Sequence, residues 1–169
     1  MIRLNKTTEY GLMALRHMSR KRLQAQSGSS ELWTSAREIA DSYGLPFEIT
    51  AKTLQRLKEA GLIQSAHGAK GGYLLQRPLS EITLAEFLEL MEGPQSVVAC
   101  SVAGGPAASE CEYGIRCEIK VLMNDLNLRL VNFLSGIRLA DLAQGTEVQS
   151  VHRSQLEPRF EKTQKEDVK

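Results

Sequence analysis

The chain has 169 residues, of which 42% are hydrophobic and 5% aromatic, so it can bury a mostly aliphatic core. No apolar run approaches the roughly 20 residues of a membrane span, and the amino terminus has no secretory signal pattern, so we expect a cytoplasmic protein.

The net charge of +1 hides an asymmetry. Residues 1–77 hold 12 Lys/Arg and 6 Asp/Glu (net +6), whereas residues 78–145 hold 4 and 9 (net −5). A basic first half indicates a polyanion-binding head on a body with another role.

Helical spacing of apolar residues predicts three helices before residue 61. The first covers residues 5–24 and a polar loop follows it. Thr34 or Ser35 caps a second helix that ends at Gly44, with Glu38 at capping-box spacing from Ser35. The third runs from about residue 47 to 60, and Gly61 closes it. We expect its inner face to carry four side chains: Ile49, Thr53, Leu54 and Leu57.

The next segments predict a hairpin and two more helices. Residues 62–65 and 72–75 are short β-rich pieces around a glycine-rich tip, and Tyr73 is expected in the core. A short helix runs from Thr83 to about Met91, and an aperiodic loop covers residues 95–116. A long helix then runs from about Cys117 to Phe133, and the polar tail 146–169 is expected to be disordered. One apolar stripe on the long helix predicts self-pairing into a homodimer: Ile119, Leu122, Leu126, Leu130 and Phe133.

Helix, turn, helix and glycine-tipped hairpin is the order of a winged helix-turn-helix domain. We therefore predict a mainly α fold with a small β-hairpin wing, joined to a long dimerisation helix. In such domains the second helix of the pair enters the DNA major groove, and the wing touches the flanking backbone. Candidate contacts to bases or phosphates lie on the third helix and the wing: Thr50, Lys52, Gln55, Arg56, Lys58, Lys70 and Gly71. Glu48 would be repelled by phosphate and could accept a hydrogen bond only from a cytosine amino group.

All three cysteines, Cys100, Cys111 and Cys117, fall within 18 residues. Thiolates are soft donors that suit iron–sulfur, zinc or copper(I). Structural zinc favours four ligands, often in Cys-x₂-Cys knuckles, and neither a knuckle nor a nearby histidine is present. On chemistry alone, two alternatives remain: three thiols with no common role, or a redox pair without metal. Three cysteines also leave the fourth ligand of a cluster to another donor.

Together these segments resemble the IscR-type (Rrf-two) family of regulators over about residues 1–145. The resemblance lies in an opening Arg3-Leu4-Asn5-Lys6, in residues 35–40 (SAREIA), in the wing 68–75 (GAKGGYLL), in Glu92-Gly93-Pro94 and in the three cysteines. Four segments, residues 35–40, 92–94, 99–101 and 139–142, look most like the branch of the family that regulates the SUF iron–sulfur assembly operon. The ten residues between Cys100 and Cys111 are more than the family's usual gap.

The resemblance implies a 2Fe–2S or 4Fe–4S cluster on Cys100, Cys111 and Cys117. Some relatives use a histidine three residues after the last cysteine as fourth ligand, but that position is Lys120 here. Others use an acidic residue of the first helix, donated by the partner subunit, and the matching position is Glu9. Arg3 joins the candidate DNA contacts through the family's opening motif.

These expectations divide the chain into a DNA-binding domain (1–93), a cluster-binding loop (94–117), a dimerisation segment (118–145) and a tail (146–169). The predicted function is a homodimeric repressor or activator of iron–sulfur assembly genes, whose cluster modulates binding to double-stranded operator DNA. Alternatives are a nitric oxide, iron or redox-responsive regulator of the same family, or a metal-free interaction module. No phosphate loop, activated nucleophile or pocket signature predicts an enzyme, a small-molecule substrate or a membrane partner.

Overall fold

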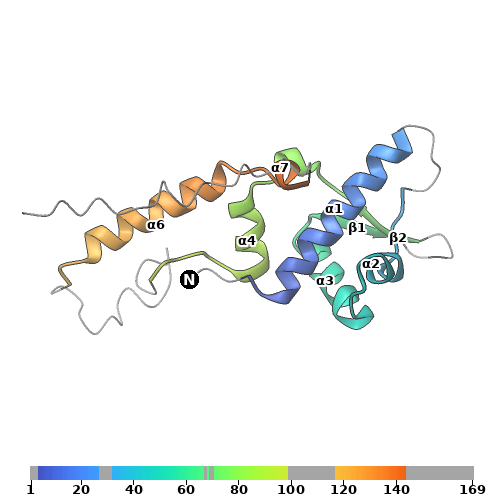
Figure 1. Cartoon of the computed structure of the whole chain (residues 1–169), viewed down its shortest axis with the longest axis horizontal. Coiled ribbons are helices and arrows are strands. Elements are labelled where there is room, and N and C mark those ends of the chain that lie inside the picture. The colour runs from blue at the N-terminus through green and yellow to red at the C-terminus, as the bar shows by residue number, and fades with distance from the viewer. Residues whose placement is uncertain (1–3, 27–31, 67, 69–70, 99–116, 144–169) are drawn as a thin grey trace, which may run out of the picture.

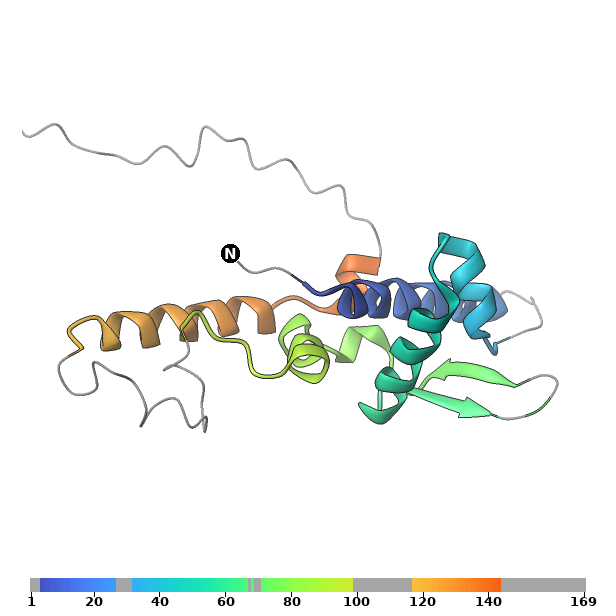
Figure 2. The same cartoon turned by 90° about the horizontal axis from the view of Figure 1, so that it is seen from below.

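The computed structural model describes residues 4–26, 32–66, 68, 71–98 and 117–143. It is mainly helical with one antiparallel hairpin, which confirms the predicted fold class. Figures 1 and 2 show a head from which one long helix, α6, extends as an arm. The elements are α1 (Lys6–Gln26), α2 (Ala36–Tyr43), α3 (Phe47–Glu59), β1 (Ile63–Ala66), β2 (Gly72–Leu75), the 3₁₀ turn η1 (Leu79–Glu81), α4 (Leu84–Glu92), α6 (Lys120–Ser135) and α7 (Leu139–Ala143).

Local capping signals fix the ends of the short helices. The hydroxyl of Ser35 accepts from the backbone N–H of Glu38 at 3.0 Å, and Gly44 ends α2 with a left-handed φ of 63°. Thr83 caps α4 in the same way, by accepting from the N–H of Glu86 at 3.1 Å. These caps confirm the predicted starts of both helices.

The core lies where α1, α3, α4 and the hairpin meet. Its fully buried members include Leu15, Leu54, Leu57 and Phe87. Gly11 lets α1 approach α4 closely, because a Cβ there would lie 3.3 Å from both Met91 Cε and Phe87 Cζ. Tyr73 packs partly buried against this core, as expected.

The predicted inner face of α3 is wrong at its first turn. Ile49 is 42% exposed, whereas Thr50 is 1% exposed and its hydroxyl donates to the carbonyl of Pro46 at 3.0 Å. A one-residue error in helical phase exchanges the two, and the hydroxyl of Thr50 is buried without penalty because it finds a local acceptor. Thr53, Leu54 and Leu57 are buried as expected.

The hairpin is fixed to the segment that precedes α2. Thr34 and Tyr73 exchange two backbone hydrogen bonds, of 3.0 Å and 2.8 Å. A side chain at Gly72 would not fit, because its Cβ would lie 2.8 Å from the carbonyl oxygen of Thr34. The wing therefore has a defined position beside α3, where β1 pairs with β2 from Ile63↔Leu75 to Ala66↔Gly72.

The arm α6 is anchored at its carboxyl end. Leu134 is buried in the head, and the N–H of Leu84 donates to the carbonyl of Ile137 at 2.8 Å. The helix begins at Lys120, three residues later than predicted, since Cys117 lies in the preceding turn. Within the described residues, no helix is both long and apolar enough to cross a membrane.

Most of the predicted stripe on α6 is exposed in the single chain. Leu122 is 60% exposed, Leu126 43% and Phe133 66%, whereas Leu130 packs partly against the core. Single exposed apolar residues are normal on a protein surface, but these leucine and phenylalanine side chains lie close together on one helix. Such a contiguous apolar patch is typical of an interaction surface. The predicted tail 146–169 lies outside the described residues.

Candidate functional site

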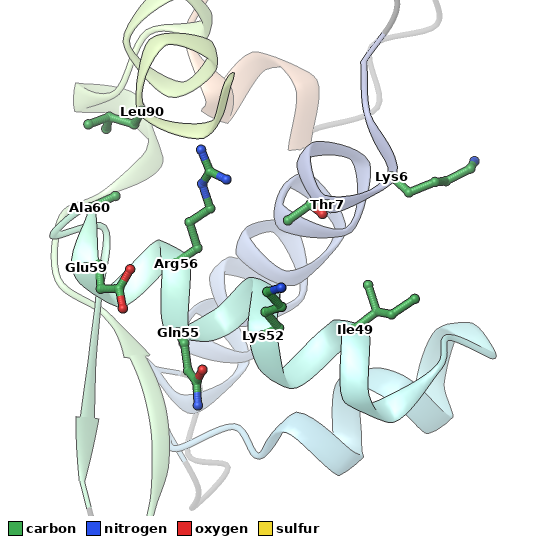
Figure 3. A pocket seen from close by; sticks show the side chains of 9 residues that line it. All are labelled: Lys6, Thr7, Ile49, Lys52, Gln55, Arg56, Glu59, Ala60 and Leu90. Atoms are coloured by element: carbon green, nitrogen blue, oxygen red, sulfur yellow. The ribbon is translucent and has the colours of Figure 1, made fainter. Parts of the chain in front are cut away.

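One face of helix α3 is exposed, and this face lies between two grooves. One groove, of about 880 Å³, separates α3 from the start of α1 and from α4, and we call it the α1 groove (Figure 3). Its lining consists of Lys6, Thr7, Ile49, Lys52, Gln55, Arg56, Glu59, Ala60 and Leu90. The other, of about 270 Å³, separates α3 from the hairpin, and we call it the hairpin groove; it is lined by Gln55, Lys58, Ser65, Ala66, Gly72 and Tyr73.

The predicted DNA contacts divide between these two grooves. Lys52 and Arg56 line the α1 groove, Lys58 lines the hairpin groove, and Gln55 belongs to both. All four side chains are exposed. Figure 3 shows Arg56 extending from α3 toward α4 and Gln55 pointing to the opposite side.

Three other predicted contacts have different outcomes. The buried, hydrogen-bonded side chain of Thr50 contradicts its expected reach to DNA. Gly71 is described at the base of the wing tip, where its N–H donates to the carbonyl of Gly68 at 2.9 Å. Arg3 and Lys70 lie outside the described residues.

The start of α1 adds polar groups to the α1 groove. Asn5 caps the helix, and its side-chain oxygen accepts from the N–H of Thr8 at 2.8 Å. Lys6 lines the groove and pairs with Glu9, with 2.6 Å between Nζ and Oε2. The lining of the α1 groove includes three cationic side chains, Lys6, Lys52 and Arg56. Its one acidic lining residue is Glu59, so the lining carries a net positive charge.

A partly buried ionic contact, which the sequence did not reveal, holds α2 against α1. Lys21 Nζ lies 2.8 Å from Glu38 Oε1 and also donates to the carbonyl of Trp33, while His17 Nε2 lies 3.1 Å from the same carboxylate oxygen. Burial raises the pKa of Glu38, but hydrogen bonds and charge from Lys21 and His17 outweigh burial and leave that pKa below its ordinary value. Glu38 thus both completes the α2 cap and fixes the helix-turn-helix on α1.

Of the predicted cluster ligands, Cys117 and Glu9 are described, and Cys100 and Cys111 lie outside the described residues. Cys117 is partly exposed, is a free thiol, and lies in the turn that leads into α6. Glu9 lies on the first turn of α1, where Lys6 pairs with it. Within the described segments, no three His, Cys, Asp or Glu side chains gather as a metal site.

The segment that leads to Cys100 is tied down on the arm. The N–H of Val97 donates to the side-chain oxygen of Asn127 on α6 at 3.1 Å. The side chain of Gln95 donates to the carbonyl of Gly93 at 2.8 Å, which shapes the turn after α4. Nothing in the sequence pattern singles out Asn127, because the contact joins residues 30 positions apart.

Comparison with known proteins agrees with this architecture. A family model described as Rrf2, iron-dependent transcriptional regulator, matches residues 4–145. The chain is similar to the HTH-type transcriptional regulator IscR of Photorhabdus laumondii, with 31% identity over 144 residues that cover 85% of this chain and 82% of the relative.

Two solved structures share the fold. CymR, the global cysteine regulator of B. subtilis, has a TM-score of 0.62 and 24% identity, over 87% of this chain and all of CymR. IscR of T. potens has a TM-score of 0.55 and 22% identity, over 88% of this chain and 91% of that protein. Regulators of this family bind DNA and are not enzymes. With its winged helix-turn-helix head and a family match over most of its length, the chain belongs to the Rrf2 family of DNA-binding transcriptional regulators.

Proposed function

We propose that this regulator is a homodimer that senses an iron–sulfur cluster and controls genes of iron–sulfur cluster assembly. The observation that carries the proposal is the place of Cys117. It lies three residues before the start of α6, the arm whose exposed apolar stripe would join two heads. A group bound at Cys117 would therefore act at the amino-terminal end of the arm, opposite the end that is anchored in the head, and the arm is the helix that would set the spacing of the two heads.

The described part of the head supports a role for α3 as the DNA-reading helix. An α-helix fits the major groove, and a phosphate backbone then runs along each of its sides. The α1 groove with Lys52 and Arg56, and the hairpin groove with Lys58, lie on the two sides of α3. Gln55, between them, would meet base edges.

The donor chemistry supports a cluster on Cys100, Cys111 and Cys117. Three thiols within 18 residues supply soft ligands, and Cys117 is a partly exposed free thiol. The relatives named IscR support the same assignment. For the fourth ligand we propose Glu9 of the partner subunit, which would have to leave its 2.6 Å pair with Lys6. A bound cluster supplies a redox-sensitive and removable link among these side chains.

Coupling would follow from the mechanical connections of the chain. The cysteine segment joins α4 of the head to α6 of the arm, and Asn127 holds its first part on α6. Fixing this segment would fix the tilt of the arm and hence the separation of two α3 helices, which must match half-sites about one helical turn apart. Operator DNA should in turn raise or lower cluster affinity, because such coupling is reciprocal.

The test is anaerobic purification of the full chain, with absorption spectroscopy and counts of iron and acid-labile sulfide. We expect a coloured protein whose iron and sulfide fall to background when Cys117 is replaced by Ser. Glu9→Ala should shift the spectrum or shorten the lifetime of the cluster, whereas Glu89→Ala, an exposed carboxylate on α4, should not. Colourless protein with intact DNA binding would contradict cluster sensing and leave a metal-free regulator.

A further inference from the structure

An exposed aliphatic side chain lies on the face of α3 that we assign to DNA. Ile49 is 42% exposed and lines the α1 groove together with Lys52 and Arg56. It occupies the first turn of α3, one turn before Lys52, and Figure 3 shows its side chain standing clear of the ribbon. The adjacent Thr50, which is 1% exposed, faces the core instead of Ile49.

We infer that Ile49 reads the 5-methyl group of thymine in the operator. In the major groove, thymine is the base that presents a methyl group, and apolar side chains recognise it by contact. The cations around Ile49 would hold DNA in the groove, so that charge complementarity selects DNA as the occupant of this apolar surface. This inference rests on the proposed role of α3 as the DNA-reading helix.

The neighbouring apolar residues are less suited to this contact. The ring of Phe47, also 42% exposed, is covered on one side by the guanidinium of Arg37, 4.7 Å from the ring centroid. Leu90 lines the same groove but lies on α4 rather than on α3. Ile49 is therefore the large aliphatic side chain of α3 that remains available in the α1 groove.

The experiment uses deoxyuridine, which lacks only the 5-methyl group of thymine. The probe is the duplex that full-length protein selects from a randomised pool, with each symmetric pair of thymines replaced in turn by deoxyuridine. Removing one buried methyl group weakens binding about fourfold, and one in each half-site about 16-fold. We expect this loss at one symmetric pair of positions with the wild-type protein.

The loss should disappear in Ile49→Ala, which binds thymine and deoxyuridine duplexes equally, and should be largely kept in Ile49→Val. Leu90→Ala, a matched control in the same groove, should discriminate like wild type. Truncation of an exposed side chain should leave the melting temperature nearly unchanged.

The outcomes separate this inference from the proposed function. If the wild-type protein selects no duplex, the role of α3 fails and the inference fails with it. If it binds its selected duplex but no deoxyuridine pair weakens binding, only the thymine readout is overturned. If the loss persists in Ile49→Ala, another side chain reads the methyl group and the assignment to Ile49 is overturned.

Discussion

The N–H of Val97 donates to the side-chain oxygen of Asn127 at 3.1 Å, so the segment before Cys100 is held on the arm that begins after Cys117. This hydrogen bond fixes the position of Val97, three residues before Cys100, relative to α6. It thereby links the proposed cluster site to the helix proposed for dimerisation.

Replacing Asn127 by Ala should destabilise the bound cluster. A hydrogen bond of this kind contributes about 1 kcal/mol, which is about fivefold in cluster retention. The measurement is the decay of cluster absorbance after exposure to air. DNA affinity of the cluster-free protein should stay unchanged, and Asn132→Ala, at an exposed position on the same helix, should decay like wild type. Equal lifetimes for Asn127→Ala and wild type would remove Asn127 from the coupling.

Replacing Lys21 by Met should destabilise the head by about 1 kcal/mol at neutral pH, since the ion pair with Glu38 is partly exposed and screened by water. The pKa of Glu38 is lowered in the folded protein. Its contribution is therefore complete above its ordinary pKa of 4.5 and is lost as pH falls through the lower folded value.

Urea unfolding at neutral pH and well below pH 4.5 tests this sign. The difference between wild type and Lys21→Met should shrink on acidification, and Arg20→Met, a neighbouring exposed cation on α1, should show little difference at either pH. A gap that widens at acidic pH would mean that Glu38 does not stabilise the head through its charge.

Replacing Leu126 by Glu should dissociate the proposed homodimer. The substitution removes the burial of a leucine side chain at the centre of the apolar interface. It also adds the free-energy cost of desolvating a carboxylate there. Sedimentation equilibrium should show monomer for Leu126→Glu and dimer for wild type and for Asn132→Glu, outside the apolar stripe. A dimer that survives Leu126→Glu would place the interface elsewhere.

Replacing Lys58 by Ala should weaken DNA binding to all sequences alike. If Lys58 neutralises one phosphate per subunit, the slope of log affinity against log salt should become less steep by about two per dimer. Fluorescence anisotropy over a range of salt concentrations measures it, with Arg129→Ala on the arm as control. An unchanged slope would show that the hairpin groove does not hold a backbone phosphate.

Local signals in the sequence predicted much of the fold. The caps at Ser35 and Thr83 and the glycine at 44 act over a few residues, so the sequence alone locates them. Local signals define the rotation of a helix about its axis less well. The sequence therefore predicts Ile49 on the inner face of α3, where the structure has Thr50. Their burial depends on how α3 is rotated against α1, and one residue changes the direction of a side chain by about 100°.

Contacts between distant segments could not be predicted. Thr34 pairs with Tyr73, Lys21 with Glu38, and Val97 with Asn127, each across a separation that no local pattern encodes. The cationic positions on α3 followed from periodicity. Their division between two grooves depends on the packing of α1 and the hairpin, which only the structure supplies.

The central claim is that a cluster at Cys117 and its two companion cysteines changes how the paired heads hold DNA. The most direct measurement is the anaerobic affinity of one preparation for its selected duplex, with the cluster intact and after its removal by chelation, at one salt concentration. Our account predicts that the two affinities differ at least fivefold and that Cys117→Ser shows the cluster-free value under both conditions. Identical affinities for the intact and cluster-free protein would contradict it.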